Sequence, residues 1–392
     1  MTLGVRRGFL KRVIVLAMFG VLLSGCGQPT SELAPSHSPR HTPTPSPTPS
    51  PSPTPAPTPT PLPAPPNLPG APGIHLPAGF SAYVYARGLG TTTAMAFGPD
   101  GRLYLTTAAG AIEVVGSPGA GPRLLVSGLP TALGLAWRGN DLYVSVRGSI
   151  RHYGLNNGGL TGGATVVGGL PVGRHQNDWI LPLSNGDFLL GLGSTCDVCS
   201  ESDARSATVL RFHGDWSYAG VVLRGSRNPY GLALRPSTGD AYVTINGQDN
   251  LGSQPADELV RVAAGEDAGW PRCWPAYPDG SLHGSCGGVA VPVALFAPHS
   301  SADGIAFQDG AEFGNDYADN AFVTEWGTNL GGPVGRRVER VVLSGAVSNE
   351  HGEVSDFATG FSHPLAIVEA PDGGLLIGDY GTGQATEIFR TS

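Results

Sequence analysis

The sequence predicts an all-β fold, a six-bladed β-propeller, over residues 73–392. The first observation is a phrase that recurs along this region: an apolar run of strand length, a Gly- or Pro-containing turn, and a second apolar run. The second observation is the lack of apolar stripes at helical spacing, which argues against a helical solenoid. The six copies of the phrase occupy residues 95–107, 135–146, 180–193, 232–245, 305–326 and 369–380.

Each copy is typical of a β-hairpin, because Asp-Gly, Asn-Gly and Thr-Gly pairs supply the positive φ angles of tight turns. Six copies over this length give about 53 residues per repeat, close to a four-stranded blade with some long loops. One blade cannot bury both faces of its sheet, so six are expected to close around a central channel. Propellers bind ligands at one mouth of this channel, on the loops beside the hairpins.

Residues 1–25 are organised like an export signal. Basic residues at 6, 7, 11 and 12 precede the apolar run Val13–Leu23, which is too short to span a bilayer. The run ends in Leu-Ser-Gly-Cys26, which resembles the lipobox of bacterial lipoproteins and implies lipid attachment at Cys26. We therefore expect a lipid-anchored chain in the cell envelope, on the cell surface or in the periplasm. The alternative is an ordinary cleaved signal in which Cys26 has no role.

Residues 26–72 are expected to form a stalk. From Thr42 to Pro66 nearly every second residue is Pro, interleaved with Thr, Ser and Ala. Such a segment cannot bury apolar area and adopts extended polyproline II, so it could reach roughly 78 Å. It would act as a spacer between the membrane and the propeller.

The charge of the chain narrows its choice of partners. The formal net charge is −8, and the single lysine, Lys11, lies within the predicted signal. An acidic, lysine-free domain argues against nucleic-acid binding. Arginine alone is left to bind an anionic ligand.

Four cysteines remain in the predicted propeller. In an oxidising compartment an even number favours disulfides, and the simplest pairing is local, Cys196 with Cys199 and Cys273 with Cys286. The alternative is a zinc site, which would require all four to converge although only one pair has CxxC spacing.

Three short segments beside the hairpins carry residues suited to chemistry. His175 enters the third blade, where an imidazole either acts as a base near neutral pH or satisfies a backbone carbonyl. Arg227-Asn228 enters the fourth blade, where a guanidinium binds a ligand carboxylate or forms a surface salt bridge. Gly247-Gln248 leaves that blade in an oxygen-rich turn, which suits Ca²⁺ or is an ordinary turn.

Together, these segments resemble the quinoprotein sugar dehydrogenases, the glucose and sorbosone dehydrogenase family that uses pyrroloquinoline quinone. The resemblance extends from about Leu76 to Arg390. It is most specific in residues 226–271, where SRNPYGLAL, TGDAYVTINGQDNLG, DELVRV and GWP follow in this order. The GSTCDVC sequence at 193–199 resembles the sorbosone-type branch.

The resemblance implies an exported oxidoreductase that acts on the CH–OH group of an aldose or related sugar. A hydride would pass to pyrroloquinoline quinone, and the electrons then to a periplasmic or cell-surface acceptor. It also implies that His175 is the general base and that Arg227 and Asn228 contact the cofactor and the substrate. The backbone carbonyls of Gly247 and Gln248 would hold Ca²⁺.

Two departures from the family pattern bear on the site. Ser194 stands where glucose-type enzymes orient the base with an Asp, and Asp178 and Asp197 are the candidates to replace that Asp. The family also uses a fifth-blade Lys for a cofactor carboxylate. We expect Arg336 and Arg337 to replace it, the alternative being that this pair lies on a solvated strand edge.

Two other functions fit a propeller of this composition. A non-catalytic propeller that binds carbohydrate or a protein partner would tolerate the departures at the site. A lactonase-type hydrolase with Ca²⁺ in the channel would need several carboxylates and amides around the metal, and acidic residues stand at too few strand entrances for this.

Overall fold

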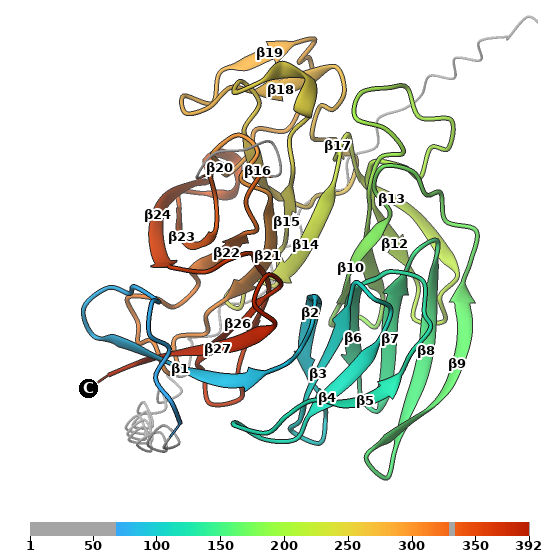
Figure 1. Cartoon of the computed structure of the whole chain (residues 1–392). Helices are drawn as coiled ribbons and strands as arrows, with labels where there is room; N and C mark the ends of the chain where they lie inside the picture. The colour runs from blue at the N-terminus through green and yellow to red at the C-terminus, as the bar shows by residue number, and fades with distance from the viewer. Residues whose placement is uncertain (1–67, 329–333, 392) are drawn as a thin grey trace, which may run out of the picture. The chain divides into compact units, whose positions relative to one another are not determined.

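The computed structural model describes residues 68–328 and 334–391 and has six antiparallel sheets arranged around a central channel (Figure 1). The predicted six-bladed propeller is therefore confirmed. The expected signal, the lipidation site at Cys26 and the Pro-rich segment Thr42–Pro66 lie outside the described residues. Within the described ranges, no helix has the length and apolar character needed to cross a membrane.

The first three blades follow the order of the chain, each strand pairing with the next. The first blade contains β2 (Thr92–Phe97), β3 (Leu103–Thr107), β4 (Ile112–Val115) and β5 (Arg123–Val126). The second contains β6 (Ala132–Arg138), β7 (Asp141–Val146), β8 (Ser149–Asn156) and β9 (Gly159–Val167). The third contains β10 (Asn177–Pro182), β11 (Phe188–Leu192), β12 (Thr208–Phe212) and β13 (Tyr218–Arg224), with β17 (Glu266–Asp267) parallel to β13.

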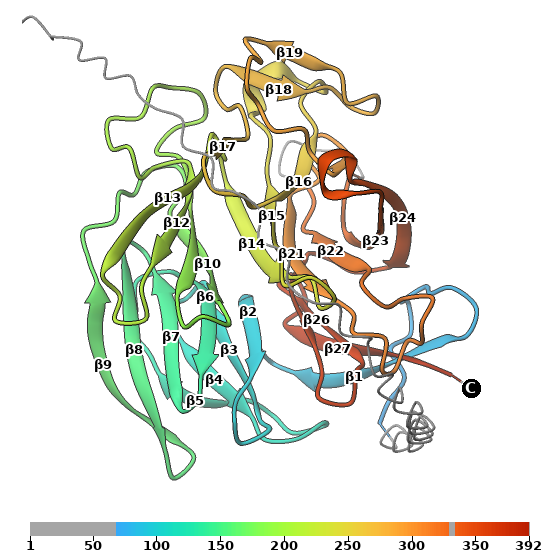
Figure 2. The ribbon, with the colours of Figure 1, turned by 180° about the vertical axis from the view of Figure 1, so that it is seen from behind.

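The last three blades include one insertion and the closure of the ring. The fourth contains β14 (Pro229–Leu234), β15 (Ala241–Ile245), β16 (Asp257–Arg261) and β20 (Ala294–Phe296), with the 3-10 turn η1 (Asp249–Leu251) after β15. The hairpin β18 (Cys273–Pro275) and β19 (Leu282–Gly284) projects from this blade (Figure 2). The fifth contains β21 (Ala302–Phe307), β22 (Ala321–Glu325), β23 (Arg337–Ser344) and β24 (His351–Thr359), with the 3-10 turn η2 (Val347–Asn349) between the last two. The sixth contains β25 (Pro364–Glu369), β26 (Leu375–Asp379), β27 (Gln384–Arg390) and β1 (Phe80–Arg87).

The N-terminal strand closes the ring, because β1 pairs antiparallel with β27 as the outer strand of the sixth blade. The preceding residues also take part, since the Val84 amide donates to the Pro69 carbonyl at 3.0 Å and Gly70 forms a bridge with Tyr83. Among the described residues, Leu68 and Pro69 already contact the propeller, although they precede the expected boundary at residue 73.

The first strand of each blade lies innermost and contacts the first strands of the neighbouring blades. Hydroxyl groups join successive blades by donating to carbonyl oxygens of the next inner strand. These bonds are Thr93 to Ala132 (2.7 Å), Ser145 to Asn177 (3.0 Å), Thr244 to Asp303 (2.5 Å) and Thr324 to Leu365 (2.7 Å). At Gly231 the inner strands approach so closely that a Cβ would lie 2.2 Å from the Asp303 carbonyl oxygen. The channel wall is thus rigid, which suits a binding site built on it.

Candidate functional site

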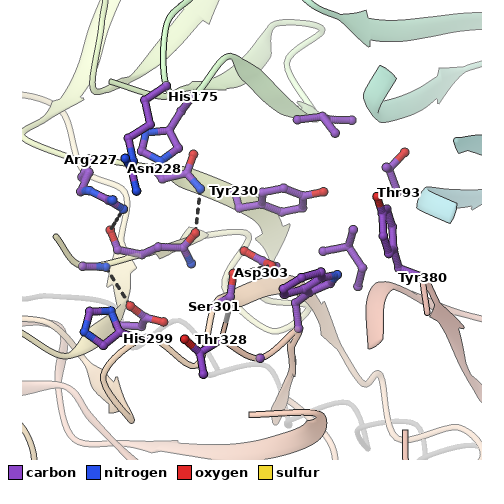
Figure 3. A pocket seen from close by; sticks show the side chains of 18 of the residues that line it. Thr93, His175, Arg227, Asn228, Tyr230, His299, Ser301, Asp303, Thr328 and Tyr380 are labelled. Carbon is purple, nitrogen blue, oxygen red and sulfur yellow. Dashed lines mark hydrogen bonds between the residues drawn. The ribbon is translucent and has the colours of Figure 1, made fainter. Parts of the chain in front are cut away.

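A cavity of about 490 Å³ opens at one mouth of the channel (Figure 3). All six blades contribute to its wall, through residues that include Thr93, Leu133, His175, Asn228, Ser301, Trp326 and Tyr380. Four of the residues selected from sequence, His175, Arg227, Asn228 and Gly247, line this one cavity. Segments that are separated by 50 or more residues of sequence are therefore brought to the same place by ring closure.

The hydrogen bonds around His175 select one tautomer of its imidazole. The Ser194 hydroxyl donates to the carbonyl oxygen of Cys196 at 2.6 Å. A hydroxyl has one hydrogen, so Ser194 must accept from the His175 Nδ1–H, which lies 3.0 Å away. His175 Nε2 is then the unprotonated nitrogen, with a lone pair that can take a proton. Neither Asp178 nor Asp197, the acids that we considered as orienting groups, hydrogen-bonds His175 in the described part of the chain; Ser194 itself does so.

The surroundings of His175 keep the ring neutral. Burial, and then the guanidinium groups of Arg227 and Arg174, lower the pKa of His175 from its usual 6.5 to about 3. A neutral imidazole is the form required of a general base, although these neighbours also disfavour the imidazolium that forms when the base accepts a proton.

Arg227 is buried and paired with two carboxylates. Its Nη2 and Nε lie 2.8 and 3.1 Å from Asp197 Oδ1, and its Nη2 lies 3.2 Å from Asp249 Oδ2. Asp249 also pairs with Arg174, so two cations and two anions form one compact network at the cavity wall. Burial opposes ionisation of Asp197, but the Asp249 amide and Arg227 outweigh it and hold the pKa of the Asp197 carboxyl below its usual value.

The CxxC loop holds both His175 and Arg227 in place. Cys196 and Cys199 form a disulfide, as predicted, and the loop that it closes contains the Cys196 carbonyl and Asp197. The indole N–H of Trp270 donates to the Asp197 carbonyl at 2.9 Å, which ties the loop to the fourth blade. Cys273 and Cys286 form the second predicted disulfide, in the insertion that carries β18 and β19.

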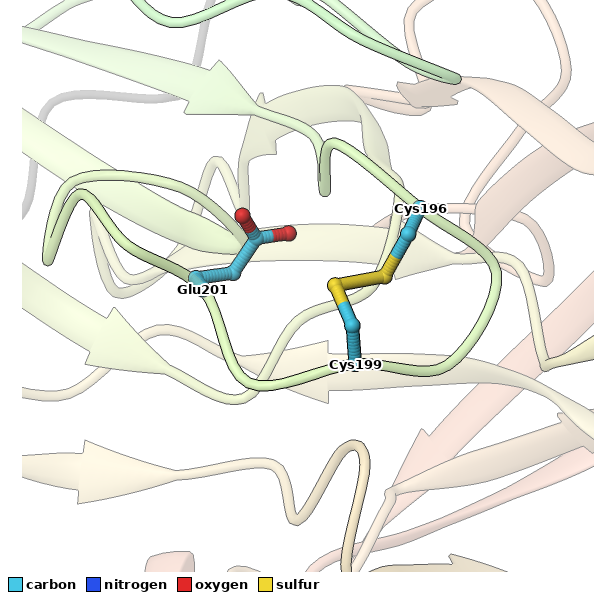
Figure 4. Close-up of side chains that lie close together, drawn as sticks. All are labelled: Cys196, Cys199 and Glu201. Carbon is cyan, nitrogen blue, oxygen red and sulfur yellow. A yellow bond between two sulfur atoms is a disulfide. The ribbon is translucent and has the colours of Figure 1, made fainter.

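The two sulfurs of the CxxC loop lie close to the carboxylate of Glu201 (Figure 4). This group does not make a zinc site, because both sulfurs are consumed by the disulfide and zinc requires thiolates. Glu201 instead accepts hydrogen bonds from the Thr195 amide and hydroxyl, both at 2.6 Å, and thereby fixes the strand exit after Ser194.

The Gly247 turn is held by Asp257, the first residue of β16. The Gly247 amide donates to Asp257 Oδ1 at 2.8 Å, and Ser300 and the Ala302 amide both reach Oδ2 at 3.2 Å. A Cβ at position 247 would lie 2.6 Å from the Ala256 carbonyl oxygen, so only glycine fits. Burial raises the pKa of Asp257 to about 6, and this carboxyl also lines the cavity.

Two buried oxygens beside this turn have no hydrogen-bond partner. They are Gln248 Oε1 and Glu258 Oε2, and both residues border a void of about 10 Å³ behind Gly247. This volume suits one water or one ion. Gly247 borders both this void and the main cavity, whereas Gln248 borders only the void. Carboxylate and amide oxygens are the ligands that Ca²⁺ prefers, and these two accept no hydrogen bond within the described part of the chain.

The fifth-blade arginines lie apart from the cavity. Arg337 Nε is 3.0 Å from Glu325 Oε2, its Nη1 is 2.8 Å from Asp356 Oδ1, and Arg336 is exposed. Neither is among the described residues that line the cavity. The carboxylates around Arg337 satisfy its charge, so we do not propose either arginine as a cofactor ligand.

Several cavity residues were not selected from sequence. Trp326 follows β22, stacks on His363 with ring centroids 4.1 Å apart, and contacts Tyr380 edge-on. His299 and Ser301 also line the cavity, with φ angles of 62° and 53°, which are uncommon outside glycine and cluster at functional sites. An aromatic residue directly after a strand, as in Glu-Trp-Gly at 325–327, was the available signal for Trp326.

The fourth and fifth blades carry a recognisable family signature. Residues 213–357 match the glucose/sorbosone dehydrogenase family model. This segment includes Arg227, Asn228, Gly247 and Gln248, whereas His175 precedes it.

Comparison with solved structures supports the same fold. The calcium structure of a Trichoderma reesei carbohydrate-active enzyme of family AA12 has a TM-score of 0.72 at 18% identity, over 82% of this chain and 98% of that one. The pyranose dehydrogenase PQQ domain of Coprinopsis cinerea has a TM-score of 0.72 at 17% identity, over 83% and 99%. The PQQ-bound aldose sugar dehydrogenase of Streptomyces coelicolor has a TM-score of 0.62 at 21% identity, over 80% and 100%. At these identities the likeness shows the propeller fold.

One curated relative is an uncharacterised protein of Borreliella burgdorferi. It is 25% identical over 214 residues, which is 50% of this chain and 55% of the relative. The chain thus spans about half the length of the curated relative that it matches.

Proposed function

We propose that this chain is a quinoprotein oxidoreductase that oxidises the CH–OH group of an aldose or related sugar. The observation that carries the proposal is the convergence, on one cavity, of a neutral His175 of defined tautomer, the Arg227-Asn228 pair and the Gly247 turn. The family match of residues 213–357 supports the same reading.

The cavity fits pyrroloquinoline quinone and Ca²⁺ in size and chemistry. Its volume lies within the range of about 300–1,000 Å³ that is usual for small-molecule sites. Trp326 and Tyr380 offer aromatic surface, Arg174 and Arg227 offer N–H donors whose charge Asp197 and Asp249 balance, and Gly247 offers its backbone oxygen at the cavity wall. The Gln248 and Glu258 side-chain oxygens lie at the small void behind Gly247. When bound, the metal-polarised quinone would supply the hydride acceptor.

The chain itself would supply the base and the orientation. His175 Nε2 would take the proton of the sugar hydroxyl, while Ser194 holds Nδ1–H and keeps the ring in place. Asn228 Nδ2 donates to Asn246 Oδ1 at 2.7 Å, which leaves the Asn228 side-chain oxygen as an acceptor on the cavity wall. Arg227, held by Asp197 and Asp249, would keep its position as charge develops nearby.

We further propose that the enzyme works outside the cytoplasm, anchored by a lipid on Cys26 and spaced by the Pro-rich stalk. Two disulfides fit an oxidising compartment. The electrons would leave to a periplasmic or cell-surface acceptor. The CxxC segment, which holds both His175 and Arg227, supports assignment to the sorbosone-type branch.

The test is reconstitution of the purified chain with Ca²⁺ and pyrroloquinoline quinone, followed by sugar-dependent reduction of a dye. His175→Ala should retain quinone binding and lose at least about a hundredfold in rate, the usual contribution of a general base. An active His175→Ala variant would remove the base assignment. A chain that binds no quinone at micromolar concentration would support the non-catalytic propeller that binds carbohydrate or a protein partner.

A further inference from the structure

The six inner strands share one irregularity that aims a side chain into the channel. Each first-to-second-strand pairing shifts register at the same place, as in a β-bulge. The residues at this position, in blade order, are Thr93, Leu133, Asp178, Tyr230, Asp303 and Leu365. All except Asp178 line the main cavity, so together they form a ring that is the floor of the site.

Three consecutive members of this ring are polar and deeply buried. Asp178, Tyr230 and Asp303 are 1%, 7% and 4% exposed, and they come from the third, fourth and fifth blades. Each has an oxygen without a hydrogen-bond partner: Asp178 Oδ2, the Tyr230 hydroxyl and Asp303 Oδ1. The second oxygen of Asp303 accepts from the Ser301 hydroxyl at 3.0 Å.

The charges around these groups are of one sign. Burial, and then repulsion by Asp303, raises the pKa of Asp178, and burial raises the pKa of Asp303 to about 8. Within the described ranges, neither carboxyl forms an ion pair with a basic side chain. Two deeply buried carboxyls without an ion-pair partner, and a deeply buried phenol, are costly unless something binds them.

We propose that the channel floor binds a hard divalent cation, with Asp178, Asp303 and the Tyr230 hydroxyl as its protein ligands. A proton satisfies one orphaned oxygen, whereas an oxygen-liganded cation satisfies all three and neutralises both carboxylates. Entry is available from the cavity, which reaches Tyr230 and Asp303 (Figure 3). This site lies on the inner strands and is separate from the Gly247-Gln248 turn, and it does not depend on the proposed enzymatic activity.

The test uses the full chain, freed of metal by a chelator and without quinone, titrated calorimetrically with CaCl₂ at pH 7.5. Asp178→Asn and Asp303→Asn should each lose one equivalent of bound Ca²⁺ or weaken it at least about tenfold, because carboxylate count sets affinity. Tyr230→Phe should weaken the same equivalent. Glu353→Gln, an exposed acid on β24, is the charge-matched control and should bind as the unaltered chain does.

Thermal unfolding gives a second readout. Added Ca²⁺ should raise the Tm of the unaltered chain and of Glu353→Gln, and this rise should shrink in the two Asn variants. Unfolding in chelator shows that the variants are folded, which we expect because Asn preserves shape and removes repulsion. The proposal would be overturned if the unaltered chain binds no Ca²⁺, or if the Asn variants show the same stoichiometry, affinity and Tm shift as the unaltered chain. Protons or water would then be what satisfies these oxygens.

Discussion

Replacing Ser194 by alanine tests the tautomer on which the proposed base depends. Ser194 is fully buried, accepts from His175 Nδ1–H and donates to the Cys196 carbonyl. A buried group that loses its partner costs about 1–3 kcal/mol, which corresponds to about five- to 150-fold in rate if the cost falls on the reactive form. We therefore expect Ser194→Ala to lower kcat within this range and to change KM little.

The assay combines kinetics on the reconstituted enzyme with ¹⁵N NMR of histidine-labelled protein. The His175 signals should report protonated Nδ1 in the unaltered chain and a mixture of tautomers in Ser194→Ala. Ser226→Ala is the matched control, since Ser226 is equally buried but its hydroxyl has no partner. A Ser194→Ala variant that keeps both the rate and the spectrum, or a Ser226→Ala control that loses as much activity, would refute the role of Ser194 in setting the tautomer. Ser194→Thr should restore the hydroxyl and much of the rate.

The two disulfides, the Arg337–Glu325 ion pair and the buried groups His175 and Asp303 each give a further prediction. Replacing both Cys196 and Cys199 by serine opens a short disulfide loop and should lower stability by about 2 kcal/mol, whereas replacing Cys273 and Cys286 opens a longer loop and should lower it by about 3 kcal/mol. The first double variant should nevertheless lose more activity, because its loop holds His175 and Arg227. Denaturant unfolding and kinetics of the two double variants compare these directly. Arg337→Ala should leave quinone affinity unchanged and lower stability by about 1–3 kcal/mol, because it leaves the buried Glu325 carboxylate without its cation. The loss of stability should be larger at pH 8 than at pH 5, since Glu325 is more ionised at the higher pH. A large loss of quinone affinity in a stable variant would indicate that Arg337 is a cofactor ligand. Without added cation, two groups should change the free energy of unfolding with pH in opposite directions. His175 should lower stability as the pH decreases below about 6.5, because the unfolded chain then binds a proton that the native His175 does not. Asp303 should lower stability as the pH increases from about 4 to 8, because the native carboxyl keeps a proton that the unfolded chain releases. Urea unfolding across pH should show a shallower alkaline decline in Asp303→Asn and an unchanged acid limb, because other buried carboxyls with raised pKa values, such as Glu325 and Glu387, keep the rest of the decline.

Much of the site could be anticipated because propeller repeats place function beside the hairpins. His175, Arg227, Asn228 and Gly247 were found from short segments at strand entrances and exits, and the structure gathers them on one cavity. The position of Arg337 apart from the cavity could not be anticipated, because a sequence does not show that three carboxylates surround it in space. The aromatic wall at Trp326 and Tyr380 comes from different blades, so no local pattern contained it.

By itself, the sequence determined the repeat, the hairpins and the local disulfides, since turn chemistry and strand periodicity act over neighbouring residues. The tertiary structure decided which polar groups meet. Ring closure sets Asp178, Tyr230 and Asp303 around one channel, whereas the β10–β11 pairing within the third blade places Ser194, rather than a carboxylate, beside His175. The channel arrangement depends on the distances between blades, which follow from packing around the whole ring and cannot be read from any single segment of the sequence.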